Sequence, residues 1–278
     1  MTIPPAALAA VLLGAVLHAS WNLAVRAGRD RRRETMLVVA GATILAIAAL
    51  PFLPQPRAAA WPFLAVSAAL HVVYFALIAE AYAHGEVSLA YPLMRGTAPM
   101  LTAILAWAVL GEEISLSGWL GIATICGGVA LMAHRKGAAG ERAAIRVALA
   151  NAVVIAAYTL NDATGARASG NAAAYTLWIF PLTALPTLLW FHLGRPVEWP
   201  SRAEWLRGAG GGACSIGAYA LALWAMTVAP VAPIAALREA AMLFGIVLAR
   251  IFLGERPGRR RWGAAAAITA GAIILRLG

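Results

Sequence analysis

The distribution of apolar and polar residues divides the chain into ten apolar stretches, separated by short polar breaks or by breaks that contain Pro and Gly. A helix crosses a bilayer core of roughly 30 Å with about 20 apolar residues. The stretches have about that length, so the pattern predicts an all-α integral membrane protein with ten transmembrane helices and no separate soluble domain. The predicted spans are 4–25, 34–53, 61–82, 87–109, 115–133, 144–163, 171–192, 206–228, 231–252 and 259–277.

Part of the pattern occurs twice. Residues 110–131 read LGEEISLSGWLGIATICGGVAL, and 143 positions later residues 253–274 read LGERPGRRRWGAAAAITAGAII. Five spans in each half is an odd number, so the second copy enters the membrane inverted relative to the first. Inverted repeats are a common construction of secondary transporters, with a site near the midplane between the halves. We predict two inverted five-helix repeats, at 1–137 and 138–278.

Composition agrees with a membrane location. Hydrophobic residues make up 62% of the chain and charged residues 12%, whereas soluble domains carry about 25% charged residues. The two cysteines, Cys126 and Cys214, lie inside predicted spans, so neither a disulfide framework nor a zinc site is expected. The sequence contains no P-loop pattern, and direct use of ATP is therefore unsupported. We expect no cofactor and no metal.

The net charge of +10 comes largely from a few loops. Sixteen of the 22 Lys and Arg residues follow the first, fifth, seventh and ninth spans: Arg26, Arg29, Arg31, Arg32, Arg33, Arg135, Lys136, Arg142, Arg146, Arg195, Arg202, Arg207, Arg256, Arg259, Arg260 and Arg261. The opposite side holds only Arg57, Arg167 and Arg276. The positive-inside rule places the basic loops in the cytoplasm and both termini outside. The charge thus meets membrane lipid headgroups and not nucleic acid, in a bacterial-type inner membrane.

Each repeat contains Leu-Gly-Glu at the end of a predicted helix. Gly111 and Gly254 are suited to end their helices as the residue after the C-cap. Glu112 and Glu255 would then lie just before the next helix, whose N-terminus favours a carboxylate. We interpret both glutamates as architectural in preference to solute-binding.

Several stretches resemble the EamA-type members of the drug/metabolite transporter superfamily. They are YPLMRGTAP (91–99), LGEEISLSGWLGI (110–122), ALRE (236–239), LGERPGRRRWG (253–263) and the opening HASWN (18–22). The Tyr-Pro element of the first half is absent from the second, where APVAPIAALRE stands instead. The resemblance implies a ten-helix secondary transporter that works by alternating access, often as an exporter of small metabolites, with no particular substrate. Many relatives place both termini in the cytoplasm, so orientation stays open.

Polar side chains inside the spans are the candidate solute ligands, because such groups usually face the protein interior or a cavity. Helical spacing gathers them on common faces, which predicts a cavity of imidazole, amide, hydroxyl and aromatic groups. The predicted substrate-binding residues are His18, Trp21, Asn22, His71, Tyr74, Tyr82, Tyr91, Arg95, Tyr158, Asn161, Tyr219 and Arg238. His18 and His71, which titrate near neutral pH, and Glu239 are the candidate proton carriers.

The two deep arginines suggest what the solute carries. If Arg95 faces the cavity, a carboxylate or phosphate-like group is its natural partner, and aromatic faces suit an apolar or cationic remainder. An amino acid or a related organic anion fits. Structural alternatives exist: Arg95 could pair with helix carbonyls or Glu80, and Arg238 with Glu239 or Glu80. Asp162, near the end of its predicted span, is interpreted as part of a solvated helix terminus.

The sequence therefore favours an outward-directed secondary transporter of a small polar metabolite, with a monomer as the working expectation. A multidrug exporter of the same fold is one alternative, although exchange of cations for protons needs an embedded carboxylate and the deep charges here are mainly arginines. A lipid flippase or a membrane-embedded enzyme is less favoured. An enzyme would need a metal cluster, a Ser/His pair or paired carboxylates at one site. HExxH, GxSxG and Cys/His clusters are absent from the sequence, and no catalytic residue is predicted.

Overall fold

The computed structural model describes residues 3–28, 30–84, 86–133, 140–192 and 199–277. Within these ranges the chain forms helices and no strand, which confirms the all-α prediction. The helices are α1 (Pro5–Ala27), α2 (Arg31–Ala49), α3 (Trp61–His84), α4 (Val87–Leu110), α5 (Leu116–Ala130), α6 (Glu141–Ser169), α7 (Ala172–His192), α8 (Arg202–Val228), α9 (Val231–Leu237), α10 (Ala240–Leu253) and α11 (Arg259–Leu277), with short 3-10 turns η1 (Leu50–Phe52) and η2 (Ala58–Ala60).

Eight segments of the described chain are helical, long and apolar enough to cross a membrane. One of them, Val231–Leu253, contains both α9 and α10. α5 is apolar but only 15 residues long, and α11 begins with three consecutive arginines. The protein is therefore a multi-pass membrane protein.

Two predicted spans differ from the structure in an informative way. The span predicted at 144–163 is part of α6, which continues to Ser169, so that Asp162 lies inside the helix and has hydrogen-bond donors inside the protein. The span predicted at 231–252 is divided into α9 and α10 at Arg238 and Glu239. In both cases a buried polar group has partners on other helices, which sequence periodicity does not reveal.

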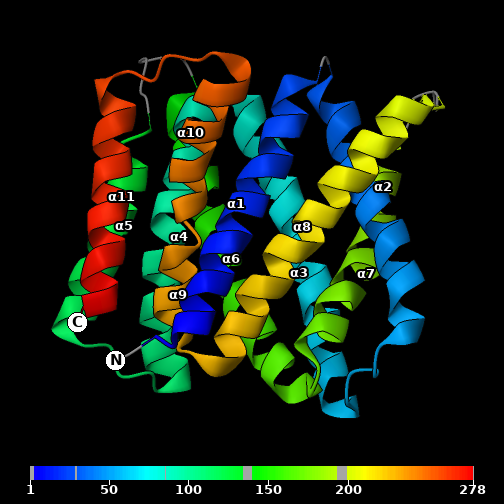
Figure 1. The fold of residues 1–278 in the computed structure, drawn as a ribbon, viewed down its shortest axis with the longest axis horizontal. Coiled ribbons are helices and arrows are strands. Elements are labelled where there is room, and N and C mark those ends of the chain that lie inside the picture. The colour runs from blue at the N-terminus through cyan, green and yellow to red at the C-terminus, as the bar shows by residue number, and fades with distance from the viewer. Residues whose placement is uncertain (1–2, 29, 85, 134–139, 193–198, 278) are drawn as a thin grey trace.

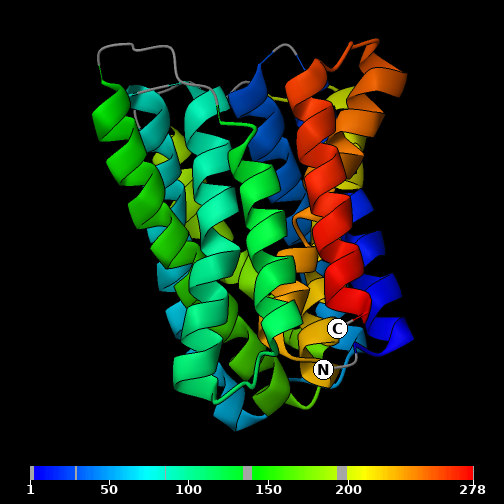
Figure 2. The same ribbon diagram turned by 90° about the vertical axis from the view of Figure 1, so that its left-hand side faces the viewer.

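The two halves of the chain run in opposite directions. α1 starts at the end of the molecule where both termini lie, whereas α6 starts at the other end, as Figures 1 and 2 show. The packing repeats with the halves exchanged: α1 packs on α8 and α10, and α6 packs on α3 and α4. This exchange brings elements of both halves to every wall of the molecular centre.

Gly111 and Gly254 end α4 and α10 in the same way. Their φ angles are 66° and 65°, in the left-handed region. The N–H of Gly111 donates to Ala106 O, and the N–H of Gly254 donates to Ala249 O. Glycine adopts this conformation without a steric penalty, so the predicted helix ends are confirmed.

Glycines allow α2 and α8 to approach very closely. A Cβ added at Gly212 would lie 2.3 Å from the backbone nitrogen of Ala42, and one at Gly208 would lie 2.7 Å from Leu37 O. Small residues permit such contacts between helices in lipid. The contact fixes α2 as one wall of the central region.

The largest cluster of buried apolar side chains lies at the end of the molecule where the termini are. The first turns of α1, the last turns of α8 and all of α9 contribute to it, with Ile3, Ala7, Val11, Leu223, Met226, Val231, Ile234 and Leu237 among its members. Dense packing excludes water from this end. Within the described residues, this packed end closes off one side of the molecular centre.

Candidate functional site

A cavity of about 180 Å³ lies at the centre of the helices, between the two halves. Eight of the predicted ligands line it: His18, Trp21, His71, Tyr74, Arg95, Tyr158, Tyr219 and Arg238. Thr35, near the start of α2, and Thr187, near the end of α7, also line it. Both helix ends lie at the upper end of Figure 1, so the cavity extends away from the packed terminus end.

The other four predicted ligands do not line this cavity. Asn22 donates from Nδ2 to the carbonyl of His18, 2.8 Å away, and Asn161 donates to the carbonyl of Phe63 at 2.8 Å. Tyr82 packs on a smaller core cluster formed by α3, α4 and α6, and Tyr91 is half-buried on α4. A solute-binding role for any of the twelve stays a prediction.

Arg95 is held by a carboxylate from the other half of the chain. Its Nη2 lies 2.7 Å from Oε1 of Glu239, and its Nε donates to Oε2 at 3.2 Å. Both residues are buried, and Glu239 stands at the break between α9 and α10. Within the described residues, neither Glu80 nor a helix carbonyl pairs with Arg95; Glu80 is exposed and bonds His84 at 2.8 Å.

Arg238 is the repeat equivalent of Arg95 but has a different environment. Its Cζ lies 5.4 Å from the centroid of the Tyr219 ring, a distance at which a cation interacts with an aromatic face. In the described part of the chain it forms no ion pair with a carboxylate. Its guanidinium therefore presents an uncompensated positive charge to the cavity that it lines.

Aromatic rings form the wall facing the two arginines. His71 stacks on Tyr158 with centroids 4.5 Å apart and an interplanar angle of 28°, and it meets Tyr219 edge-on at 6.1 Å. Its Nδ1 lies 2.8 Å from the carbonyl oxygen of Ser67. A carbonyl only accepts, so Nδ1 carries the proton and Nε2 is the acceptor in the neutral ring. His18 contacts Trp21 edge-on at 5.2 Å.

Asp162 is a polar residue that the sequence interpretation misplaced. It is fully buried within α6 and is not part of a solvated helix end. Oδ1 accepts from the hydroxyl of Tyr175 and from Nδ2 of Asn161, each at 3.1 Å, and Oδ2 accepts from the hydroxyl of Tyr219. Its spacing of one helical turn after Tyr158 was the available signal.

Glu112 joins the two halves at the terminus end. Its carboxylate accepts from the backbone N–H groups of Val231 at 2.7 Å and Ala232 at 3.1 Å, and Nη2 of Arg167 lies 3.6 Å away. It therefore caps α9, in the other half, rather than the helix that follows it in sequence as predicted. The positive end of α9 and Arg167 both favour its charge.

Glu255 occupies the equivalent position at the other end of the molecule. It pairs with Arg26, in the last turn of α1, at 2.6 Å, and with Arg261 at 3.0 Å. Arg167 lies in the last turn of α6, the counterpart of α1. Each half thus donates an arginine from its first helix to the Leu-Gly-Glu carboxylate of the other half, once at each end.

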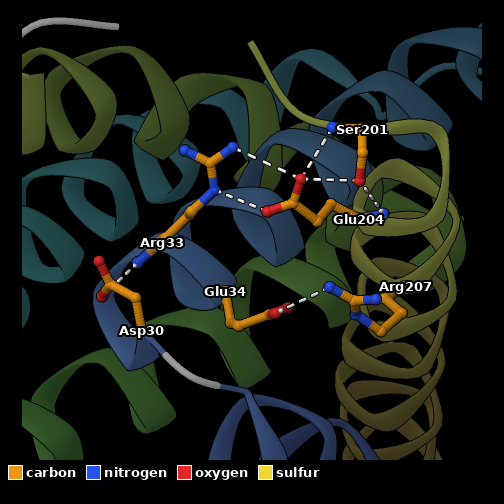
Figure 3. A network of polar contacts seen from close by, with 6 residues as sticks. All are labelled: Asp30, Arg33, Glu34, Ser201, Glu204 and Arg207. Atoms are coloured by element: carbon orange, nitrogen blue, oxygen red, sulfur yellow. Dashed lines mark hydrogen bonds and ion pairs between the residues drawn. The ribbon is translucent and has the colours of Figure 1, made fainter. Parts of the chain in front are cut away.

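An ionic network lies beside the cavity mouth, between the starts of α2 and α8 (Figure 3). Arg33 donates from Nε to Glu204 at 2.8 Å, and Arg207 pairs with Glu34 at 3.2 Å. Glu204 also completes a capping box with Ser201 at the start of α8. These contacts hold the two helices together next to Thr35, which lines the cavity.

The described residues contain no group of three or more His, Cys, Asp or Glu side chains that could hold a metal ion. The pattern of the family described as "EamA-like transporter family" matches residues 5–133 and 142–277. None of the curated proteins matches the sequence. A solved structure titled "Crystal structure of protein" is similar with a TM-score of 0.75 and 21% identity, over 98% of this chain and 96% of the other.

Proposed function

The chain belongs to the EamA-like transporter family, and from this premise we propose that it is a secondary active transporter of a small organic anion or amino acid. It would work by alternating access, outward across a bacterial-type inner membrane. Outward direction follows the resemblance of its motifs to drug/metabolite exporters. We further propose ten spans in two inverted halves, 1–137 and 138–278, with one chain as the working unit.

The observation that carries the anion assignment is the charge of the cavity wall. Arg95 and Arg238 line it, and no carboxylate is among the described residues that do. Glu239 neutralises Arg95, whereas Arg238 has no such partner within the described chain. A guanidinium in this position supports binding of a carboxylate through charge-assisted hydrogen bonds.

The size and the remaining wall favour a metabolite over a drug. The cavity measures about 180 Å³, less than the roughly 300–1,000 Å³ typical of sites for drug-sized ligands. His71, Tyr74, Tyr158 and Tyr219 supply flat, polarisable faces for a short organic remainder. The positive charge of Arg238 would repel a cationic drug, which disfavours the multidrug alternative.

Alternating access is supported by the unequal ends of the molecule. The terminus end is sealed by the apolar core and by Glu112, which bridges to α9, while the cavity extends toward the end where Glu255 pairs with Arg26. Because these contacts are equivalents in inverted halves, the opposite state would arise by exchanging their roles. Rocking of one repeat against the other is the general mode of such transporters.

Counterflow in proteoliposomes tests the proposal. Vesicles containing the purified full chain are preloaded with one member of a panel of amino acids, hydroxy acids and dicarboxylates, and uptake of the same compound in ¹⁴C-labelled form is measured. We expect exchange for at least one anionic member of the panel. Arg238→Gln should raise the half-saturation constant for that compound about 10- to 100-fold.

Arg250→Gln is the matched control, because Arg250 is an exposed arginine on the same segment, in α10. It should exchange like the wild type. Absence of exchange across the panel, or equal exchange by the two glutamine variants, would contradict the proposal.

A further inference from the structure

Asp162 is a buried carboxylate with an unusual set of partners. All three donors that the structure gives it are neutral: the hydroxyls of Tyr175 and Tyr219 and the amide of Asn161. One of them, Tyr219, also lines the central cavity, whereas Asp162 itself does not. The carboxylate therefore lies one phenol away from the solute site.

Other carboxylates at helix contacts are paired with arginine. Glu239 lies 2.7 Å from Arg95, Glu34 lies 3.2 Å from Arg207, and Glu112 lies 3.6 Å from Arg167. Within the described residues Asp162 forms no such ion pair. Protonation of Glu239 would break a buried two-point ion pair, which is costly. Protonation of Asp162 breaks none, and it removes a buried charge that no cation compensates.

We propose that Asp162 is the proton-carrying site of this transporter and that Tyr219 links it to the anion bound at Arg238. The inference rests on the proposed function, since it concerns the coupling of that same transport. It replaces His18, His71 and Glu239 as the leading proton carrier. Geometry carries it: the Tyr219 ring lies under Arg238, while its hydroxyl donates to Asp162.

The loading step is a proton relay. A hydronium ion in the cavity gives a proton to the phenol oxygen of Tyr219, while the original phenol proton passes to Oδ2 of Asp162. Tyr219 is neutral before and after, the hydronium becomes water, and Asp162 becomes an uncharged acid. No other reactant is required.

Coupling follows from the charges on the two sides of Tyr219. With Asp162 ionised, an anion bound at Arg238 lies one phenol ring away from a second buried negative charge, and the two anions repel each other. Protonation of Asp162 removes that repulsion, so anion and proton favour each other's binding by reciprocal linkage. The two should cross together, and the sum of their gradients sets the direction. An anion that accumulates inside the cell then leaves with a proton.

Several titratable or charged groups surround this pair and must be separated from it experimentally. They are Tyr158 on α6, Tyr175 on α7, His71 on α3, Arg95 on α4, and Arg238 and Glu239 at the break between α9 and α10. Asp162 is the only carboxylate that Tyr219 contacts in the described structure. A substitution that removes only the charge of Asp162 therefore separates its role from those of the surrounding groups.

The transport experiment measures cargo and protons in the same vesicles. Proteoliposomes enclosing the pH dye pyranine are given the panel anion with the strongest counterflow. Wild-type protein should move protons with the anion. Asp162→Asn, which keeps the shape of the side chain, should retain counterflow and lose the accompanying proton movement. Asp30→Asn is the matched control, since Asp30 is the only other aspartate in the sequence and is exposed; it should behave like the wild type.

A measurement without cargo keeps the inference testable when transport assays fail. Infrared difference spectra of the full chain in liposomes are recorded across a pH titration. Wild-type protein and Asp30→Asn should show the C=O stretch of a carboxylic acid appearing as pH falls, with a component that is lost in Asp162→Asn. Tyr219→Phe should keep a titrating carboxyl but slow the proton movement that accompanies transport.

The outcomes distinguish the two proposals. Net uptake of the anion by the wild type without accompanying proton movement would overturn the coupling role and leave the proposed function standing. Proton-linked transport by Asp162→Asn, or identical infrared titrations with and without Asp162, would also overturn it. If no panel compound exchanges, the proposed function fails, and the infrared titration alone decides whether Asp162 takes up a proton.

Discussion

Arg95 and Glu239 form a two-point ion pair across the two halves of the chain, with Nη2 to Oε1 at 2.7 Å and Nε to Oε2 at 3.2 Å. The glutamate stands where α9 gives way to α10. The pair therefore stabilises a broken helix at mid-molecule and places the neighbouring Arg238 at the cavity. Arg95, the arginine that the sequence favoured as a solute ligand, therefore supports the helix break that positions Arg238.

This relationship predicts a strong asymmetry between single and double substitutions. Glu239→Gln leaves the buried guanidinium of Arg95 without its counter-charge, and breaking such a pair destabilises by about 3–5 kcal/mol. Removing both charges in Arg95→Met/Glu239→Met should destabilise less than Glu239→Gln alone. Thermal unfolding in detergent measures this. If the loss of stability in the double variant equals the sum of the losses in Arg95→Met and Glu239→Met, the two residues do not interact.

Glu112 should stabilise the closed state of the terminus end, because its carboxylate joins the two halves there. In Glu112→Gln the charge that α9 and Arg167 share is lost, and a hydrogen bond to a charged group contributes about 1.5–3 kcal/mol. We expect this end to open more often. In a background without Cys126 and Cys214, a cysteine introduced by Ala232→Cys should react faster with an impermeant maleimide.

The control for that experiment is Glu113→Gln, because Glu113 is the exposed neighbour of Glu112. Its reaction rate should equal that of the parent. Equal labelling in both glutamine variants would mean that Glu112 does not hold the end closed.

The close contact of α2 and α8 gives a prediction within a single helix. Gly212→Ala places a Cβ 2.3 Å from the backbone nitrogen of Ala42, and overpacking of this kind costs about 1–3 kcal/mol. Gly210→Ala meets nothing within 4 Å and should be neutral or stabilising by up to about 1 kcal/mol, since alanine favours helix. The melting temperature of Gly212→Ala should therefore lie clearly below that of the parent, and the melting temperature of Gly210→Ala should equal or exceed it. A similar loss in both would contradict the packing.

The helical fold could be predicted from the length of the apolar stretches because each span must satisfy its own backbone in lipid. The glycine ends of α4 and α10 were likewise readable, since Gly111 and Gly254 share a motif at a fixed offset. These features depend on neighbours in sequence. The break at Arg238 and Glu239 does not, because it is stabilised by Arg95 from another helix.

The candidate site was readable only in part, for the same reason. His71, Tyr158 and Arg95 face a common cavity, as helical spacing suggests, but spacing does not say which arginine is neutralised. Asp162 resembles a helix end in the sequence because it lies near the end of the predicted span 144–163. Two of its three donors come from other helices, which the sequence does not show. Whether a buried charged residue stabilises the fold or is available to bind solute depends on partners that are remote in sequence.

Orientation in the membrane is the last prediction, and it sets which side the cavity faces. Both termini lie at the packed end (Figure 1), opposite the basic starts of α2, α8 and α11. The positive-inside rule places those starts in the cytoplasm, so the termini should be outside and the cavity of this state should face the cytoplasm. A C-terminal alkaline phosphatase fusion should be active and a C-terminal fusion to green fluorescent protein dark, whereas truncated fusions after Gly258 should give the reverse. The opposite pattern would turn the same structure into an outward-facing state, because the packed end and the cavity would exchange sides of the membrane.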